Sequence, residues 1–215
     1  MTPTNLLFNV IAGPGALLRY RTQGSLDGPL ARRLVLGTLP GAVIGAVIRV
    51  LVVPGPRVFR LVVAAVLLPI GLWLCVRTLR KAPHPAPSGI SGNAITLMAL
   101  CVGVVGGIYG IGGGSILGPI LVSRGMPVSK VAPAALTSTF LTSIAGSATF
   151  ALLALARAGP ISPDWTLGLL CGLGGLAGGY IGAALQPRVP EAALRLLLGS
   201  LAMALGLLYV VQALS

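Results

Sequence analysis

The stretch from residue 106 to residue 120 reads GGIYGIGGGSILGPI. Six of the nine residues from Gly106 to Gly114 are glycine, and Pro119 follows five residues later. Glycine disfavours a helix because its backbone is so free, and proline because it lacks an amide hydrogen. Yet this stretch lies inside an apolar run of the length that spans a membrane. The sequence therefore predicts a membrane helix that is broken or re-entrant at the glycines.

The composition indicates an all-α integral membrane protein. Of the 215 residues, 55% are hydrophobic and only 8% are charged, whereas soluble domains carry about 25% charged residues. The 15 Lys and Arg against 3 Asp and Glu give a net charge of +12. No basic cluster is interleaved with aromatic residues, so nucleic acid is not an expected partner. Basic residues between apolar runs instead set membrane orientation and contact anionic lipid headgroups.

Apolar runs divide the chain into about seven membrane segments. A spanning helix needs about 20 residues, so the short run 115–123 is counted together with the run 94–114 that precedes it. The segments are 4–18, 34–53, 58–76, 94–123, 131–156, 165–186 and 191–213.

The chain contains two related copies. Four residues match at an offset of 133: Thr4, Ile11, Ala12 and Gly13 pair with Thr137, Ile144, Ala145 and Gly146. Four more match at an offset of 137: Asp27, Gly37, Gly41 and Gly45 pair with Asp164, Gly174, Gly178 and Gly182. Internal duplication is typical of transporters. Each copy carries a Gly-x3-Gly-x3-Gly ladder. Such a ladder allows two helices to pack closely, and packing alone would explain it.

These matches predict three parts: a first repeat over 1–76, a cytoplasmic linker over 77–93, and a second repeat over 94–215. Residues 94–131, which hold the glycine cluster, have no counterpart in the first repeat. Either the given chain starts late, or its first half has lost this motif.

The distribution of Lys and Arg predicts how the repeats lie in the membrane. If the segment 94–123 crosses once, the two sides carry 8 and 7 basic residues. If it enters and returns to its own side, they carry 11 and 4. Cytoplasmic loops are enriched in Lys and Arg, so the second arrangement is favoured. It makes the two repeats inverted relative to each other.

The glycine cluster has a functional and a structural interpretation. Glycine permits the positive φ and the close backbone approach that a sharp turn needs. Irregular backbone at membrane depth is tolerated only where protein or a watery cavity surrounds it, and freed amides at a helix start can bind an anion. The structural alternative is a packing kink without a ligand.

The stretch GIYGIGGGSILGPILVSRGMPVSKVAPAALTSTF (107–140) resembles the sulfite exporter TauE/SafE family of bacterial membrane permeases. The resemblance extends through TNLLFNVIAG (4–13) and GTLPGAVIGAVIRV (37–50), and so covers nearly the whole chain. It implies a multi-pass protein of the bacterial plasma membrane that exports small, often sulfur-containing anions such as sulfite or organosulfonates.

The resemblance also implies which residues line the path of the anion: Gly110, Gly112, Gly113, Gly114, Pro119, Thr137, Ser138, Thr139, Thr4 and Asn5. Hydroxyls and amides beside a broken helix can replace the water around an anion. Each also has a structural alternative: a hydroxyl can bond its own helix, and an asparagine such as Asn5 or Asn9 can bridge two helices.

Other functional classes fit less well. An intramembrane serine protease needs a buried base near its serine, but the only histidine, His84, lies in the linker. We expect no enzyme activity, no metal site and no cofactor, and we expect Cys75, Cys101 and Cys171 to face neighbouring helices. Asp27, Asp164 and Glu191 fall at segment ends or in loops, so no proton relay is expected. A non-transporting or truncated subunit of such a permease remains the alternative function, and homo-oligomerisation stays open.

Overall fold

A computed structural model describes residues 2–26, 28–51, 56–80, 91–156 and 165–214. Within these ranges the chain is all-α, as predicted. Eight helices follow one another: α1 (Thr2–Thr22), α2 (Gly28–Leu51), α3 (Pro56–Leu79), α4 (Gly92–Tyr109), α5 (Gly113–Ser123), α6 (Val128–Ala156), α7 (Trp165–Leu185) and α8 (Glu191–Leu214). A short 3₁₀ turn, Gln186–Arg188, joins α7 to α8.

Five of the described helices are long and apolar enough to span a membrane: Gly28–Arg49, Gly92–Tyr109, Val128–Leu152, Trp165–Arg188 and Glu191–Ala213. The expected count of about seven segments stays a prediction. Several helices begin before the apolar run that predicted them. For example, α2 starts at Gly28 rather than at residue 34, because arginine is a good helix former and Arg32 and Arg33 extend the helix out of its apolar part.

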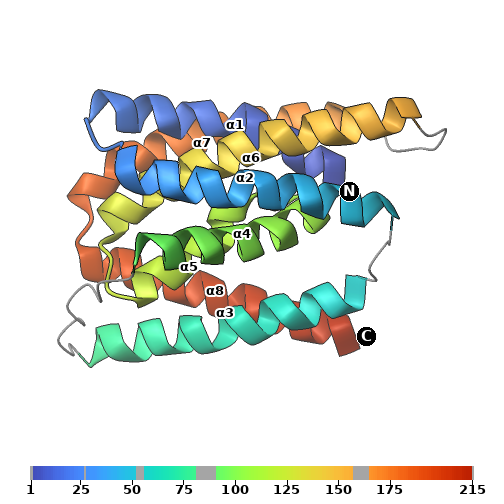
Figure 1. Cartoon of the computed structure of the whole chain (residues 1–215). Helices are drawn as coiled ribbons and strands as arrows, with labels where there is room; N and C mark the ends of the chain where they lie inside the picture. Colours follow the sequence, from blue (N-terminus) through green and yellow to red (C-terminus); the bar gives the residue numbers. More distant parts are fainter. Residues whose placement is uncertain (1, 27, 52–55, 81–90, 157–164, 215) are drawn as a thin grey trace.

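The helices form one bundle (Figure 1). Helix α1 packs against α7, α2 packs against α4, and α3 packs against α8, while α6 contacts both α1 and α2. The short helix α5 packs mainly against α6 and α4. The glycine-rich segment therefore lies among the other helices rather than at the edge of the chain's fold.

Helices α4 and α5 form a hairpin. Ile95 and Ala99, near the start of α4, share one core cluster with Leu121 and Val122, near the end of α5. Helix α5 therefore returns to the end of the bundle at which α4 begins, on the left of Figure 1. This geometry agrees with a segment that enters and returns, although the position of the bilayer itself stays a prediction.

One end of the bundle carries most of the basic side chains. It holds the last turns of α1, α3, α5 and α7 and the first turns of α2, α4, α6 and α8 (Figure 1). The described basic residues in or beside these turns are Arg19, Arg21, Arg32, Arg33, Arg77, Arg80, Arg124, Lys130, Arg188 and Arg195. Arg49 and Arg60 belong to turns at the opposite end. The fold thus gathers at one end the charges that the sequence count assigns to the cytoplasm.

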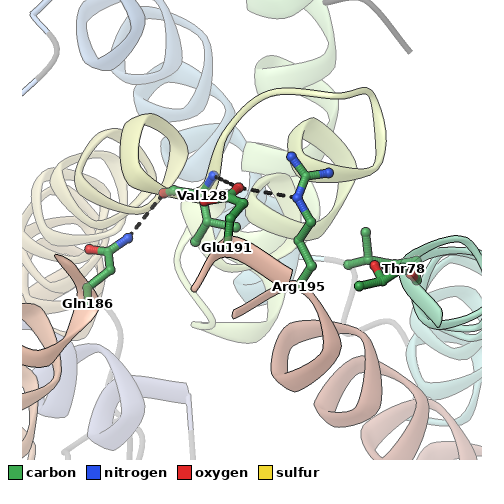
Figure 2. Close-up of polar contacts among 6 residues, drawn as sticks. Thr78, Val128, Gln186, Glu191 and Arg195 are labelled. Carbon is green, nitrogen blue, oxygen red and sulfur yellow. Dashed lines mark hydrogen bonds and ion pairs between the residues drawn. The ribbon is translucent and has the colours of Figure 1, made fainter. Parts of the chain in front are cut away.

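A polar cluster joins the starts of α6 and α8 at this basic end (Figure 2). The Glu191 carboxylate accepts a hydrogen bond from the backbone amide of Val128 at 2.8 Å and pairs with Arg195 Nε at 3.2 Å. Gln186 Nε2 donates to the carbonyl of Val128 at 3.3 Å. Since Arg195 is only 5% exposed, its carboxylate partner offsets the cost of burying its charge.

Two expectations about individual segments need correction. Helix α3 continues through Leu79 and α4 begins at Gly92, so the ends of the expected linker 77–93 are helical; His84 lies outside the described residues. Cys75 is half-buried, but Cys101 and Cys171 are exposed, so the expectation that they face neighbouring helices is wrong for these two. An apolar side chain gains little by leaving lipid for a protein interface.

Candidate functional site

The glycine turn between α4 and α5 depends on two left-handed residues. Gly110 has φ 69° and Gly112 has φ 77°, a region that residues with a side chain rarely adopt. The amide of Ile111 donates to the carbonyl of Gly106 at 3.1 Å and closes the end of α4. The sequence predicted that the turn needs glycines with positive φ. Gly110 and Gly112 have this conformation, whereas Gly113 already belongs to helix α5.

The turn packs closely between α2 and α6. A Cβ added to Gly113 would lie 2.6 Å from Thr38 Cγ2 on α2, and one added to Gly112 would lie 2.5 Å from Thr139 Cγ2 on α6. A Cβ on Gly114 would overlap the backbone carbonyl of Ala135. Gly113 and Gly114 are thus required by close packing, whereas Gly112 is required by both packing and backbone conformation.

Helix α1 is hydrogen-bonded to the same turn. Asn5 Nδ2 donates to the carbonyl of Gly110 at 2.8 Å across 105 residues of sequence. Gly110 is the residue that ends α4, so its carbonyl cannot be satisfied inside a regular helix. Thr4 precedes Asn5 on α1 and is half-buried. The first-repeat residues that the sequence singled out therefore lie at, or next to, the glycine turn.

The hydroxyls of α6 behave in two ways. Ser138 Oγ lies 2.7 Å from Thr38 Oγ1, and both side chains are fully buried. Thr137 Oγ1 instead donates to the carbonyl of Pro133 in its own helix at 2.8 Å, which is the structural alternative for a hydroxyl in a membrane helix. Thr38 was not predicted; the signal was a hydroxyl residue directly after Gly37 in the first glycine ladder.

A cavity of about 310 Å³ lies beside the start of α5. Its lining comes from α1, α5, α6 and α8, with Val128 at the start of α6. Three of the predicted residues line it: Gly114, Pro119 and Thr139. Gly110, Gly112, Gly113, Asn5 and Ser138 are not among its lining residues and form the turn and the contacts next to it. The roles of all of these residues stay predictions.

The lining of the cavity also includes residues that the sequence did not assign to the path, among them Gly118 and the polar residues Asn9 and Ser115. Asn9 Nδ2 is buried and has no hydrogen-bond partner among the described residues. Ser115 Oγ donates to the carbonyl of Ile111 at 3.1 Å. The signal for Asn9 was its spacing: it lies four residues after Asn5, so both share one face of α1.

The electrostatics of this cavity favour a negative ligand. Gly114 and Ser115 belong to the first turn of α5, where the helix dipole is positive and the first amides have no carbonyl partner within the helix. The Ser115 amide donates to the carbonyl of Gly112, just before the helix, at 3.4 Å. An unpaired buried amide such as Asn9 Nδ2 costs about 1–3 kcal/mol, which an acceptor oxygen would recover. No Asp or Glu is among the lining residues of the cavity. The arrangement can therefore hold a small group with several acceptor oxygens.

A second cavity, of about 390 Å³, lies at the other end of α5 and is lined by Pro69, Ile70, Trp73, Ser123 and Arg124. The guanidinium of Arg77 lies 4.8 Å from the centre of the Trp73 ring. A tryptophan with arginines around it is typical of the membrane–water interface. Within the described ranges, no group of three or more His, Cys, Asp and Glu residues could hold a metal ion.

Comparison with known proteins identifies the family of this chain. The chain is 26% identical over 203 residues to the probable membrane transporter protein YunE of Bacillus subtilis (strain 168), and the match covers 86% of this chain and 71% of that protein. No solved structure matches the chain. The family profile described as sulfite exporter TauE/SafE matches residues 1–209. This chain therefore belongs to the sulfite exporter TauE/SafE family, a family of membrane transporters.

Proposed function

We propose that this chain is a permease that exports small anions, sulfur-containing ones such as sulfite or organosulfonates, across the bacterial plasma membrane. Its family and its relative support membrane transport. The observation that carries the choice of an anion is the cavity beside α5, where the buried amide of Asn9 lies without a partner next to the first turn of a helix. The proposed substrate class follows from the donors that this cavity offers.

A sulfite or sulfonate group presents several acceptor oxygens in a compact volume. Asn9 Nδ2, the Thr139 hydroxyl and the Gly114 amide at the start of α5 would each donate to one of them. Such hydrogen bonds to a charged acceptor contribute about 1.5–3 kcal/mol each, which offsets part of the loss of hydration. The remaining lining is apolar: Val122, Val131 and Leu198 among others. It would suit the short carbon chain of an organosulfonate.

We further propose that the chain works as two inverted repeats. Each first helix of a repeat packs against the second helix of the other, α1 on α7 and α2 on α6, and the third helices α3 and α8 pack on each other. Leu6, near the start of α1, clusters with Phe150, near the end of α6, so these equivalent helices run in opposite directions. Repeats of this kind alternate access by rocking around a central site, and the glycine hairpin lies at that centre.

The test is efflux of sulfite from proteoliposomes that contain the purified full chain. We expect efflux to be saturable and inhibited by short organosulfonates. Asn9→Leu should reduce it by about tenfold or more, the equivalent of one hydrogen bond of about 1.4 kcal/mol. The control is Thr149→Val, because Thr149 bonds only its own helix at the carbonyl of Ala145. Equal efflux from Asn9→Leu and wild type would reject the cavity as the site.

The alternative is a membrane subunit of such a permease that does not transport by itself. The hairpin of α4 and α5 favours it, because no described helix of the first repeat corresponds to that hairpin. This alternative predicts no sulfite efflux from the purified chain at any protein density, whereas the permease predicts efflux that rises in proportion to the density.

A further inference from the structure

The two glycine ladders have different surroundings. On α2, a Cβ added to Gly37, Gly41 or Gly45 would lie closer than 3 Å to the backbone of α4. On α7, the matching residues at an offset of 137 are Gly174, Gly178 and Gly182. A Cβ added to any of these three would meet no atom within 4 Å. One ladder is closely packed and its copy is open.

The difference is not a shift of register, because the neighbouring faces of the two helices are used alike. On α2, Thr38 bonds Ser138 of α6, and Ala46 clusters with Phe150 of α6. The equivalents of Thr38 and Ala46 on α7 are Gly175 and Ala183, and both pack against α1. Each second helix therefore presents one face to the first helix of the other repeat. Only α2 has a further helix, α4, packed on its glycine ladder.

The open ladder leaves α7 the more exposed of the two helices. Of the residues in the apolar window of each span, 39% are buried in α2 but only 17% are buried in α7. Large apolar side chains beside the ladder are about half to two thirds exposed, with Leu170 at 67%, Ile181 at 56% and Leu185 at 49%. A bare glycine ladder forms a shallow groove in which a helix backbone gains more van der Waals contact than a mobile lipid chain does.

We propose that the ladder Gly174–Gly178–Gly182 is the docking surface for one further apolar membrane helix of the α4 kind, supplied from outside the described residues. The occupied ladder defines what this helix must look like. Helix α4 approaches α2 because it has small residues of its own there: Gly103 meets the backbone of Thr38, and Gly107 meets that of Ala42. A partner helix with small residues at the same four-residue spacing would fit α7 in the same way.

The packing of α4 also argues against a second copy of the chain as the occupant. Ala99, Gly103 and Gly107 already lie against α2, so a second copy has no free α4 surface to offer. The open glycine ladder of a second copy is again that of α7, so docking ladder on ladder would pair two equivalent helices. No such pairing occurs among the described helices, where α2 and α7 do not pack on each other.

The test uses the full chain and a synthetic peptide of residues 91–124, the α4–α5 hairpin, co-reconstituted in liposomes. Native cysteines are replaced by alanine, Thr166→Cys carries a donor dye at the exposed start of α7, and the peptide carries an acceptor. We expect saturable energy transfer that unlabelled peptide competes away. Gly178→Val should weaken this binding by at least about tenfold, because the added methyl groups fill the groove on which the peptide backbone would lie.

The matched control is Ala177→Val, which adds bulk at an exposed position about 100° around the same helix and should leave binding unchanged. Energy transfer that is absent, or that is equal in the Gly178→Val and Ala177→Val variants, would overturn the proposal. So would a disulfide-linked dimer from Gly178→Cys formed at high yield without peptide, since it would identify a second copy as the occupant. Binding is measured without any substrate, so the result is independent of the proposed transport function.

Discussion

Thr38 Oγ1 on α2 and Ser138 Oγ on α6 lie 2.7 Å apart, and neither side chain is exposed. Thr38 Oγ1 also donates to the carbonyl of Leu34 in its own helix at 2.8 Å. The methyl group of the same Thr38 side chain lies only 2.6 Å from the position that a Cβ on Gly113 would take. One threonine thus connects α2 to α6 and limits the space for the glycine turn.

This contact predicts energetic coupling between α2 and α6. Thr38→Val and Ser138→Ala should each lower stability in detergent, and the double variant should lose less than the sum of the two. Hydrogen bonds between membrane helices couple by about 0.6 kcal/mol on average, so a coupling near that value is expected. A double-mutant cycle on reversible unfolding measures it. Strict additivity would mean that the two hydroxyls contribute independently.

Gly113→Val should abolish transport while the chain still inserts into the membrane. The branched side chain cannot fit beside Thr38, so the start of α5 must move away from the cavity. Efflux at equal protein level measures the effect, with Leu152→Val as the control at a position that is 68% exposed. Gly41→Val should instead lower yield and melting temperature, since Gly41 packs on the backbone of α4. Normal efflux from Gly113→Val would disprove a role for the turn.

Asn5→Leu should loosen the glycine turn without unfolding α1. It removes the donor to the Gly110 carbonyl, which lies 2.8 Å away, and leaves that carbonyl unpaired. We expect faster hydrogen exchange in peptides that cover residues 106–116 and unchanged exchange in α8. Unchanged exchange around the turn would show that the packing of Gly112 and Gly114 alone holds it.

The sequence predicted the helices and the broken segment because both follow from local chemistry: long apolar runs form helices, and Gly110 and Gly112 permit left-handed turns. The family resemblance named ten residues for the path, of which Gly114, Pro119 and Thr139 line one cavity, and their role stays a prediction. The sequence could not assign Asn9 to the cavity or pair Thr38 with Ser138, because those contacts depend on how two helices are rotated against each other. Likewise, the two ladders are identical in spacing, and only the fold shows that Gly41 is covered and Gly178 is open.

The inverted arrangement predicts the side of the membrane on which each segment end lies. In a background without Cys75, Cys101 and Cys171, Ser91→Cys at the start of α4 should react with an impermeant thiol reagent only after lysis, because it belongs to the basic end. Ser215→Cys, beyond the described residues, should react in intact cells. Labelling of Ser215→Cys only after lysis would rule out the inverted arrangement.

The positions of the acidic residues predict the driving force for export. Coupling to protons normally needs an ionisable group within the membrane interior. Of the three acidic residues, Asp27 and Asp164 lie outside the described residues, and Glu191 begins α8 paired with Arg195 at 3.2 Å. No acidic residue lies in the middle of a described helix. Export of an anion from a cell with a negative interior gains about 2.3 kcal/mol per charge and 100 mV.

We therefore expect efflux that is electrogenic and has no obligatory proton. For a divalent anion, 100 mV would sustain a gradient of about a thousandfold, at about 1.4 kcal/mol per tenfold. Proteoliposomes with a potassium–valinomycin potential and no pH gradient test this directly: sulfite flux should rise with the imposed voltage. With the voltage clamped, an added pH gradient should change the flux little, and Glu191→Gln should keep the voltage dependence because its amide oxygen can still accept from Val128. Flux that follows the pH gradient and ignores voltage would mean that a proton is carried, and that an ionisable group outside the described residues takes part.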